Sequence, residues 1–520
     1  MTVALPLYLR ELQQEIESYA REFGLDFFDI IFEVLPYQAI NMIAAYGGFP
    51  TRYPHWRFGM EYEQLSKTHT YGLGKIYEMV INNDPCYAYL QEGNSLVDQK
   101  IVMAHVHAHC DFFKNNVWFK DTNRKMMNEM ANHATRIRRY MTRHGVDRVE
   151  GFIDTCLSLE NLIDLHAPMI RRRPAQRPPA RGENAGSNQR RGREVPRLPV
   201  QRRYLDPYIN PAEFIEKQKQ KLAEQRRQAR RFPAQPERDV LLCLMEHAPL
   251  NRWQRDVLGI IREEAYYFAP QGQTKIMNEG WASYWHSTIC TQRALDDSEI
   301  IDFADHHSGT MGTQPGRVNP YKLGIELYRY IEDKYNRGRF GKDYEECQDL
   351  DKKRRWDKKL GLGREKIFEV RRLHNDVTFV DEFLDEEFAL QQKLFGYRFN
   401  KSTGNWEIDT RAFKEIKKRL LFSLTNFGQP LIEVVDMNHA NRGELLLVHR
   451  HEGVDLKLDW ARSTMEALYR LWSRPVMVRT IVGEKHTLLR YDGQDHTAET
   501  VSAADGLGDP PAEDENDDQD

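Results

Sequence analysis

Residues 171–203 place the strongest constraint on how this chain can fold. They read RRRPAQRPPARGENAGSNQRRGREVPRLPVQRR, which is rich in Arg, Pro and Gly and almost without aliphatic side chains. Such a composition cannot bury an apolar core, so we predict a disordered insertion here, followed by a solvated, charged helix at 211–231. Any helical domain must therefore be assembled from the segments on either side of the insertion.

Periodicity divides the rest of the chain. Helical patterns dominate up to residue 395, and short β-rich runs alternate with helices after it. We predict a mainly α protein, with a large helical N-terminal and central domain and a small C-terminal α+β domain of about four strands. The predicted boundaries are 1–169 and 237–395 for the two halves of the helical domain, 170–236 for the insertion, 396–493 for the α+β domain and 494–520 for a disordered acidic tail.

Net charge, targeting signals and cysteine spacing limit the classes of protein to which this chain can belong. The formal net charge is -4, so we expect no nucleic-acid partner for the whole molecule. The basic insertion leaves open an RNA, a membrane surface or an acidic protein as its ligand. The first residues form an amphipathic helix without a signal-peptide pattern, and we find no apolar run long enough to span a bilayer, so we expect a cytoplasmic protein. Six scattered Cys without a C-x-x-C pair argue against a disulfide framework or a Cys-type zinc site.

Local patterns predict four further features of the helical domain. The apolar runs at 27–34 and 72–83 favour helices, and the Gly-, Pro- and aromatic-rich segment at 41–63 favours an ordered loop. An aromatic helix from residue 252 is expected to end at Pro270.

Histidines are concentrated in the helix predicted at residues 96–113. His105 and His109 are four residues apart on one face, and His107 and Asp111 are four apart on another. The i, i+4 spacing lets two imidazoles bind one metal ion, so His105 and His109 are candidate ligands. An H-E-x-x-H motif is absent because Val106 occupies the position of its Glu.

A second helix carries the matching carboxylate. In the stretch NEGWASYWH, residues 278–286, Glu279, Ser283 and His286 share one helical face. A carboxylate and an imidazole suit a borderline ion such as zinc. The candidate site therefore depends on whether this helix meets the helix of His105 and His109.

Five long segments carry a resemblance to a known family. AAYGGFPTRYPHWRFGMEYE, YGLGKIYEMVINN, AHVHAHCDFFKNN, TKIMNEGWASYWH and RRLHNDVTFVDEFL look like the SpoVR family, named for stage V sporulation protein R. The resemblance implies a link to spore cortex formation, or to stationary phase and stress in bacteria that do not sporulate. It also implies two partners, a serine protein kinase of the PrkA type and a von Willebrand-like protein.

A shorter resemblance concerns chemistry. E-G-W-A-x-Y is similar to the segment that supplies the third zinc ligand in some gluzincin-type peptidases. Carried over to this chain, the resemblance implies Glu279 as that ligand, with His105 and His109 as the paired imidazoles.

Two classes of function remain open at this point. The first is a zinc-dependent hydrolase of a peptide or amide bond, with Glu263 or Glu264 as general base and His286 as fourth ligand or oxyanion-orienting group. A variant is a di-iron site that also uses Glu160 or Glu246. The second is a non-enzymatic regulatory or scaffold protein that works with the kinase.

Overall fold

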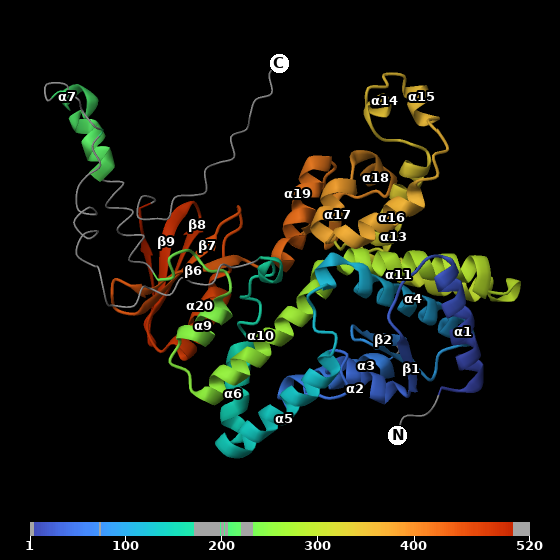
Figure 1. The fold of residues 1–520 in the computed structure, drawn as a ribbon, viewed down its shortest axis with the longest axis horizontal. Coiled ribbons are helices and arrows are strands. Elements are labelled where there is room, and N and C mark those ends of the chain that lie inside the picture. The colour runs from blue at the N-terminus through green and yellow to red at the C-terminus, as the bar shows by residue number, and fades with distance from the viewer. Residues whose placement is uncertain are drawn as a thin grey trace. The chain divides into compact units, whose positions relative to one another are not determined.

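The structure is a computed structural model that describes residues 5–71, 74–170, 198, 202, 206–219 and 232–502. Most of the predicted insertion, much of the charged helix at 211–231 and the end of the acidic tail lie outside the described residues. Within them the protein is mainly helical, with a smaller C-terminal α+β domain, as the sequence predicts (Figure 1).

The chain folds into two compact units, each made of two segments. The first unit comprises the residues up to Ile153 and those from Glu263 to Gln429, and the second comprises Asp154 to Arg262 and the residues from Pro430 on. Both units are therefore assembled from segments that lie far apart in the sequence.

The first unit is mostly helical. Its helices are α1 (Leu7–Glu22), α2 (Tyr37–Ala45), α3 (Trp56–Thr70), α4 (Leu96–Asn115), α5 (Met126–His144), α11 (Lys275–Ile289), α12 (Ile300–Thr310), α13 (Pro320–Asn336), α14 (Lys342–Glu345), α15 (Leu350–Arg354), α16 (Gly363–Leu373), α17 (Asp376–Phe383), α18 (Glu386–Gln391) and α19 (Phe413–Leu424). Its strands are β1 (Ile30–Leu35), β2 (Glu78–Ile81), β3 (Cys86–Gln91), β4 (Gly396–Asn400) and β5 (Asn405–Thr410). Short 3-10 helices lie at Val117–Phe119, Asp297–Glu299 and Thr425–Gly428, and a π-helical turn lies at Cys290–Ala294.

Helix α4 lies at the centre of the first unit. A capping box between Ser95 and Asp98 begins it, and every residue from Val97 to Phe113 except Asp98 is buried. A helix buried on all sides is a core helix, and α1 and α11 pack against it. The strands order as β1-β3-β2, with β1 parallel to β3 and β2 antiparallel to it, and α4 also contacts β2 and β3.

Helix α11 is held in place on its other side by α13. A Cβ on Gly280 would lie 2.4 Å from the Cα of Gly324, and a Cβ on Gly324 would lie 2.2 Å from the carbonyl oxygen of Ile276. The two backbones therefore touch, which only glycine allows at both positions. At the start of α11, the Asp376 carboxylate accepts hydrogen bonds from the backbone N–H groups of Ile276 and Met277, at 2.8 and 2.9 Å.

The second unit contains a five-stranded sheet in the order β10-β9-β8-β7-β6, one strand more than the sequence predicts. Strands β7 and β8 are parallel and the other neighbours are antiparallel, and α20 packs on β8 and β9. The elements are β6 (Leu431–His439), β7 (Glu444–Arg450), α20 (Leu458–Trp472), β8 (Val476–Val482), β9 (Lys485–Tyr491) and β10 (His496–Thr500), with α7 (Asp206–Ile209), α9 (Val240–His247) and the turn Ala167–Met169. Helices α6 (Val146–Leu157) and α10 (Arg252–Gln273) run across the unit boundary.

Four local predictions are wrong. The runs at 27–34 and 72–83 contribute strands β1 and β2 rather than helices, and the expected loop at 41–63 contains parts of α2 and α3. A short apolar run fits the helical period of 3.6 residues and the strand period of 2 equally well. Both segments form strands because they pair with β3. Helix α10 continues past Pro270 to Gln273, because a proline near the end of a helix removes only one hydrogen bond there.

None of the described helices is long and apolar enough to cross a membrane.

Candidate metal centre

His105, His109 and Glu279 come together where α4 and α11 pack, and we call them the central cluster. The Glu279 Oε2 atom lies 3.6 Å from His105 Nε2 and 3.5 Å from His109 Nε2. All three ligand atoms lie within 4.8 Å of one another. Both histidines are 6% exposed, and Glu279 Oε2 is buried without a hydrogen-bond partner among the described residues. A buried carboxylate oxygen without a donor is costly, so this oxygen needs a positive partner.

Hydrogen bonds on the far side of each ring leave Nε2 free to bind a metal. His109 Nδ1 lies 2.9 Å from the Asn278 Oδ1 atom, which only accepts, so Nδ1 carries the proton. His105 Nδ1 lies 2.9 Å from His286 Nδ1. His286 Nε2 lies 3.1 Å from His307 Nδ1. His105 Nδ1 can therefore donate to His286 Nδ1 while His286 Nε2 donates to His307 Nδ1. Outer partners of this kind orient metal-binding imidazoles in proteins.

The charge states in this cluster follow from burial and from the neighbouring groups. Burial lowers the pKa of His105 to about 4 and that of His286 well below its usual range. Burial alone would raise the pKa of the Glu279 carboxyl, but His105 and His109 hold it well below its ordinary value. Burial opposes protonation of His109 as well, but Glu279 outweighs it and raises the His109 pKa. The cluster therefore holds an ionised carboxylate facing a neutral His105, and a metal ion bound there would compete with a proton for His109.

The other face of α4 has a structural role. His107 is fully buried, with Nδ1 2.7 Å from the Met103 carbonyl oxygen and its ring edge-on to Phe27 at 4.9 Å between centroids. Asp111 accepts hydrogen bonds from the Asp26 backbone N–H and from Trp281 Nε1, both at 2.8 Å. His107 therefore packs in the core, and Asp111 ties α4 to α11.

Two side chains at the edge of the central cluster were not singled out from the sequence. Glu78 on β2 is partly buried, and burial raises the pKa of its carboxyl to about 7, against the influence of His109. Tyr321 on α13 stacks on His105 with 6.4 Å between ring centroids, and its hydroxyl lies near the Glu279 carboxylate, which adds to the effect of burial in raising the Tyr321 pKa. Glu78 lies in a segment that the sequence predicts as a helix, so its position beside the cluster was not expected. No spacing or motif in the sequence indicated Tyr321.

Glu263 and Glu264, expected as general bases, lie beside a different histidine. His133 on α5 has its Nε2 atom 3.4 Å from Glu263 Oε2 and its Nδ1 atom 3.0 Å from Glu264 Oε1. Glu160 and Glu246, the further residues of the di-iron variant, belong to the second unit, whereas the central cluster belongs to the first.

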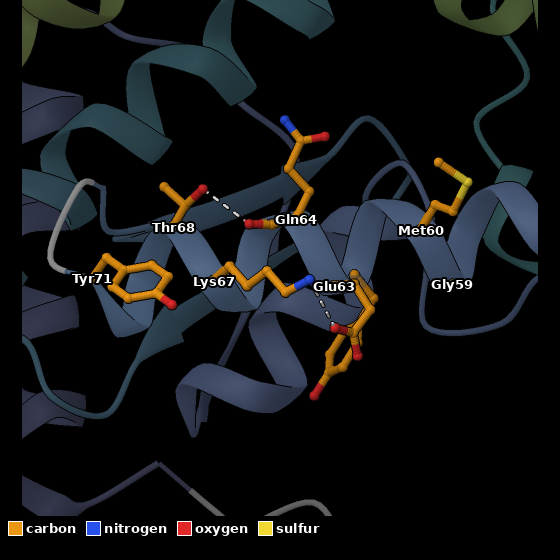
Figure 2. A pocket seen from close by; sticks show the side chains of 8 residues that line it. Gly59, Met60, Glu63, Gln64, Lys67, Thr68 and Tyr71 are labelled. Carbon is orange, nitrogen blue, oxygen red and sulfur yellow. Dashed lines mark hydrogen bonds and ion pairs between the residues drawn. The ribbon is translucent and has the colours of Figure 1, made fainter.

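A hollow of about 840 Å³ lies elsewhere on the first unit, along α3 (Figure 2). Its polar groups are used within the helix, since Thr68 Oγ1 donates to the Gln64 carbonyl oxygen at 2.9 Å and Lys67 Nζ lies 3.7 Å from Glu63 Oε2. None of its lining residues belongs to the central cluster, and they are Gly59, Met60, Tyr62, Glu63, Gln64, Lys67, Thr68 and Tyr71.

The donor set of the central cluster fits a zinc ion. Two imidazole nitrogens and one carboxylate oxygen are common zinc ligands in hydrolases, where a fourth position stays open for water. Bonds of about 2.0–2.1 Å at tetrahedral angles place ligand atoms roughly 3.3 Å apart. The N–O separations of 3.5 and 3.6 Å differ from this by a few tenths of an ångström.

Comparisons with known proteins cover almost the whole chain. The family model described as "SpoVR like protein" matches residues 6–429, and the one described as "SpoVR-like C-terminal domain" matches residues 430–482. The chain is also similar to the "Uncharacterized protein YcgB" of Escherichia coli (strain K12), with 29% identity over 497 residues, covering 89% of this chain and 90% of that protein. No solved structure matches. The two matched regions meet between Gln429 and Pro430, where the two compact units also divide.

Proposed function

This chain belongs to the SpoVR family, and we propose that it is a metal-dependent hydrolase of a peptide or amide bond. The ligands are His105, His109 and Glu279, and the metal is zinc, with iron as the alternative. The observation that carries the proposal is the buried Glu279 Oε2 atom, which faces two imidazole Nε2 atoms and has no hydrogen-bond partner among the described residues. Three protein ligands leave a coordination position for water or substrate.

Zinc at this position would supply a water of lowered pKa and would polarise the carbonyl oxygen of the substrate. Glu78 is the residue we assign as general base, because its partly buried carboxyl lies outside the ligand set and interacts electrostatically with both His109 and Glu279. Glu78 removes a proton from the attacking water and delivers it to the leaving amine. One water is consumed, the water oxygen bonds to the carbonyl carbon, and the C–N bond breaks.

Two other residues have supporting roles in this proposal. His286 receives the Nδ1 hydrogen of His105 and so keeps the His105 Nε2 lone pair directed at the metal. The Tyr321 hydroxyl lies beside the Glu279 carboxylate and is placed to donate a hydrogen bond to a developing oxyanion.

The biological setting that we propose follows from the family alone. It is a cytoplasmic role in sporulation, at the spore cortex, or in stationary phase and stress, alongside a PrkA-type kinase and a von Willebrand-like protein. Precursors of wall peptides and cytosolic peptides are then the substrates to test.

The test combines metal content and hydrolysis in protein purified without an affinity tag. We expect about one zinc per chain in the wild type and in Glu78→Gln, and hydrolysis of an amide substrate only in the wild type, since removing a general base costs roughly 10²–10⁴-fold. Metal binding with no hydrolysis of any wall-derived or cytosolic peptide would leave the non-enzymatic regulatory role. Absence of metal from every preparation would refute both the site and the reaction.

A further inference from the structure

A second group of metal-binding side chains lies in the first unit, and we call it the α5–α10 cluster. Glu129 and His133 are four residues apart on α5 and so share one face, and Glu263 comes from α10. Each offers one ligand atom, and these atoms lie within 4.8 Å of one another. The cluster shares no residue with the central cluster.

His133 is oriented toward the centre of this cluster. Its Nδ1 atom lies 3.0 Å from Glu264 Oε1, and Glu264 Oε2 in turn pairs with Arg52 Nη2 at 2.7 Å. All three side chains are buried, with exposures of 0% for His133, 5% for Glu264 and 7% for Arg52. The Glu264 carboxylate, held by Arg52, keeps the ring proton on Nδ1 of His133. A carboxylate that accepts this N–H is the usual second partner of a metal-binding histidine.

The opposite nitrogen of this ring lacks a hydrogen bond. His133 Nε2 is buried and has no hydrogen-bond partner among the described residues, although Glu263 Oε2 lies 3.4 Å away. A buried ring nitrogen that faces two carboxylates without a hydrogen bond is an unusual feature in a folded protein.

We propose that Glu129, His133 and Glu263 bind a divalent first-row transition metal ion, distinct from the ion of the central cluster. One imidazole and two carboxylates form a harder donor set than two imidazoles and one carboxylate, which favours Mn²⁺ or Fe²⁺ more than the central cluster does. Glu263 is 47% exposed in its side chain, so water completes the coordination from the solvent side.

The same side chains also have a metal-free arrangement. Burial opposes protonation of His133, but Glu263 and Glu264 outweigh it and raise the His133 pKa to about 9. His133, and to a smaller extent Arg136, lower the pKa of the Glu263 carboxyl in return. Without a metal ion the cluster therefore holds an imidazolium beside the carboxylates of Glu263 and Glu264. An incoming ion replaces the Nε2 proton, which leaves to solvent.

The experiment is a Mn²⁺ titration of the full-length protein, followed by the loss of the free Mn²⁺ electron paramagnetic resonance signal. The background variant is Glu279→Gln, which disables the central cluster. We expect about one bound Mn²⁺ per chain in this background, and at least a tenfold weaker affinity after Glu129→Gln and Glu263→Gln are added together. Glu63→Gln, an exposed carboxylate on α3 outside both clusters, is the matched control and should leave the affinity unchanged.

Carboxylate-to-amide changes keep the side-chain volume, so folding is retained even if His133 itself cannot be replaced. Binding of Mn²⁺ with equal affinity in the background and in the added double variant would overturn the proposal. The absence of Mn²⁺ binding from the Glu279→Gln background, when the wild type binds one ion, would also overturn it, because the ion then belongs to the central cluster alone.

Discussion

The central cluster and the α5–α10 cluster are built from the same two residue types but differ in charge and in exposure. The central cluster has two histidines and one carboxylate, and its Glu279 side chain is 13% exposed. The α5–α10 cluster has one histidine and two carboxylates, and its Glu263 side chain is 47% exposed. The pKa of His105 falls to about 4, whereas that of His133 rises to about 9 and that of His109 is also raised.

These contrasts explain how each cluster is stabilised without a metal ion. Glu264 and Glu263 offset the charge of a His133 imidazolium, but His133 Nε2 has no hydrogen-bond partner among the described residues. In the central cluster one carboxylate faces two rings at distances too long for strong hydrogen bonds, and Glu279 Oε2 stays without a donor among the described residues. In the central cluster His105 is neutral and His109 has a pKa raised by Glu279 against the effect of burial, so a metal ion there competes with a proton at His109 and not at His105.

The largest expected effect is the loss of zinc from Glu279→Gln. The amide keeps the volume of the side chain but removes the charge and one of three ligands. We expect the affinity for zinc to fall more than roughly 100-fold, because loss of an outer-shell partner alone costs roughly 10–100-fold. Zinc per chain after dialysis against a weak chelator measures the effect. Glu263→Gln is the matched variant and should retain the zinc, whereas equal losses in both variants would show that the clusters are not independent.

The next effect concerns the side chains that accept a hydrogen bond from Nδ1 of each ligand histidine. Asn278→Ala removes the acceptor that orients His109, and Glu264→Gln removes the negative charge that orients His133. We expect Asn278→Ala to weaken zinc binding and Glu264→Gln to weaken Mn²⁺ binding, each by roughly 10–100-fold and each without effect on the other ion. Competition with a chromophoric chelator gives both affinities. Crossed effects would contradict the assignment of each partner to its cluster.

A smaller effect is a difference in the pH dependence of stability in metal-free protein. The folded-state pKa of His133 is raised, so its contribution to stability is full below the unfolded pKa of about 6.5 and is lost as the pH rises through about 9. The pKa of His105 is lowered, so its contribution is present above about 6.5 and is lost as the pH falls toward about 4. Each contribution is roughly 1–3 kcal/mol, since one pKa unit corresponds to about 1.4 kcal/mol and Glu263 is half exposed.

The measurement is thermal unfolding between pH 4.5 and 9.5 in the presence of a chelator. Glu263→Gln should reduce the loss of stability on the alkaline side, and His105→Gln should reduce the loss on the acidic side. If the two variants changed the same limb of the profile, the opposite charge states of the two histidines would be wrong.

The ligands of the central cluster could be predicted from the sequence because helical periodicity is a local property. The spacing of His105 and His109 places them on one face of α4 whatever surrounds the helix, and Glu279 needed only a helix at 275–289. Their meeting depends on the packing of α11 against α4, which no spacing reveals. The glycines Gly280 and Gly324 allow the backbones of α11 and α13 to touch, and Tyr321 on α13 reaches the cluster from that side.

The sequence did not predict the position of Glu78 or the role of Glu263 and Glu264. Glu78 lies on β2, which exists because its residues pair with β3, and such pairing is decided by tertiary contacts. Glu263 and Glu264 were recognised as adjacent acids on a helix, but the histidine between them comes from α5, far away in the sequence. The sequence also did not show which face of α4 carries the metal ligands, the face of His105 and His109 or that of His107 and Asp111. This assignment can be tested directly.

The smallest expected effect comes from His107→Leu, which separates the structural histidine of α4 from the two ligands. His107 is fully buried, its Nε2 atom has no hydrogen-bond partner among the described residues, and burial lowers its pKa to about 4. Leucine has a similar volume and removes a buried polar atom, so we expect the free energy of unfolding at pH 7 to change by less than about 1.5 kcal/mol. Zinc content should stay at the wild-type value, measured by the same dialysis. Loss of zinc from this variant alone would place the metal on the opposite face of α4, and the central cluster would then be an ordinary buried ion pair.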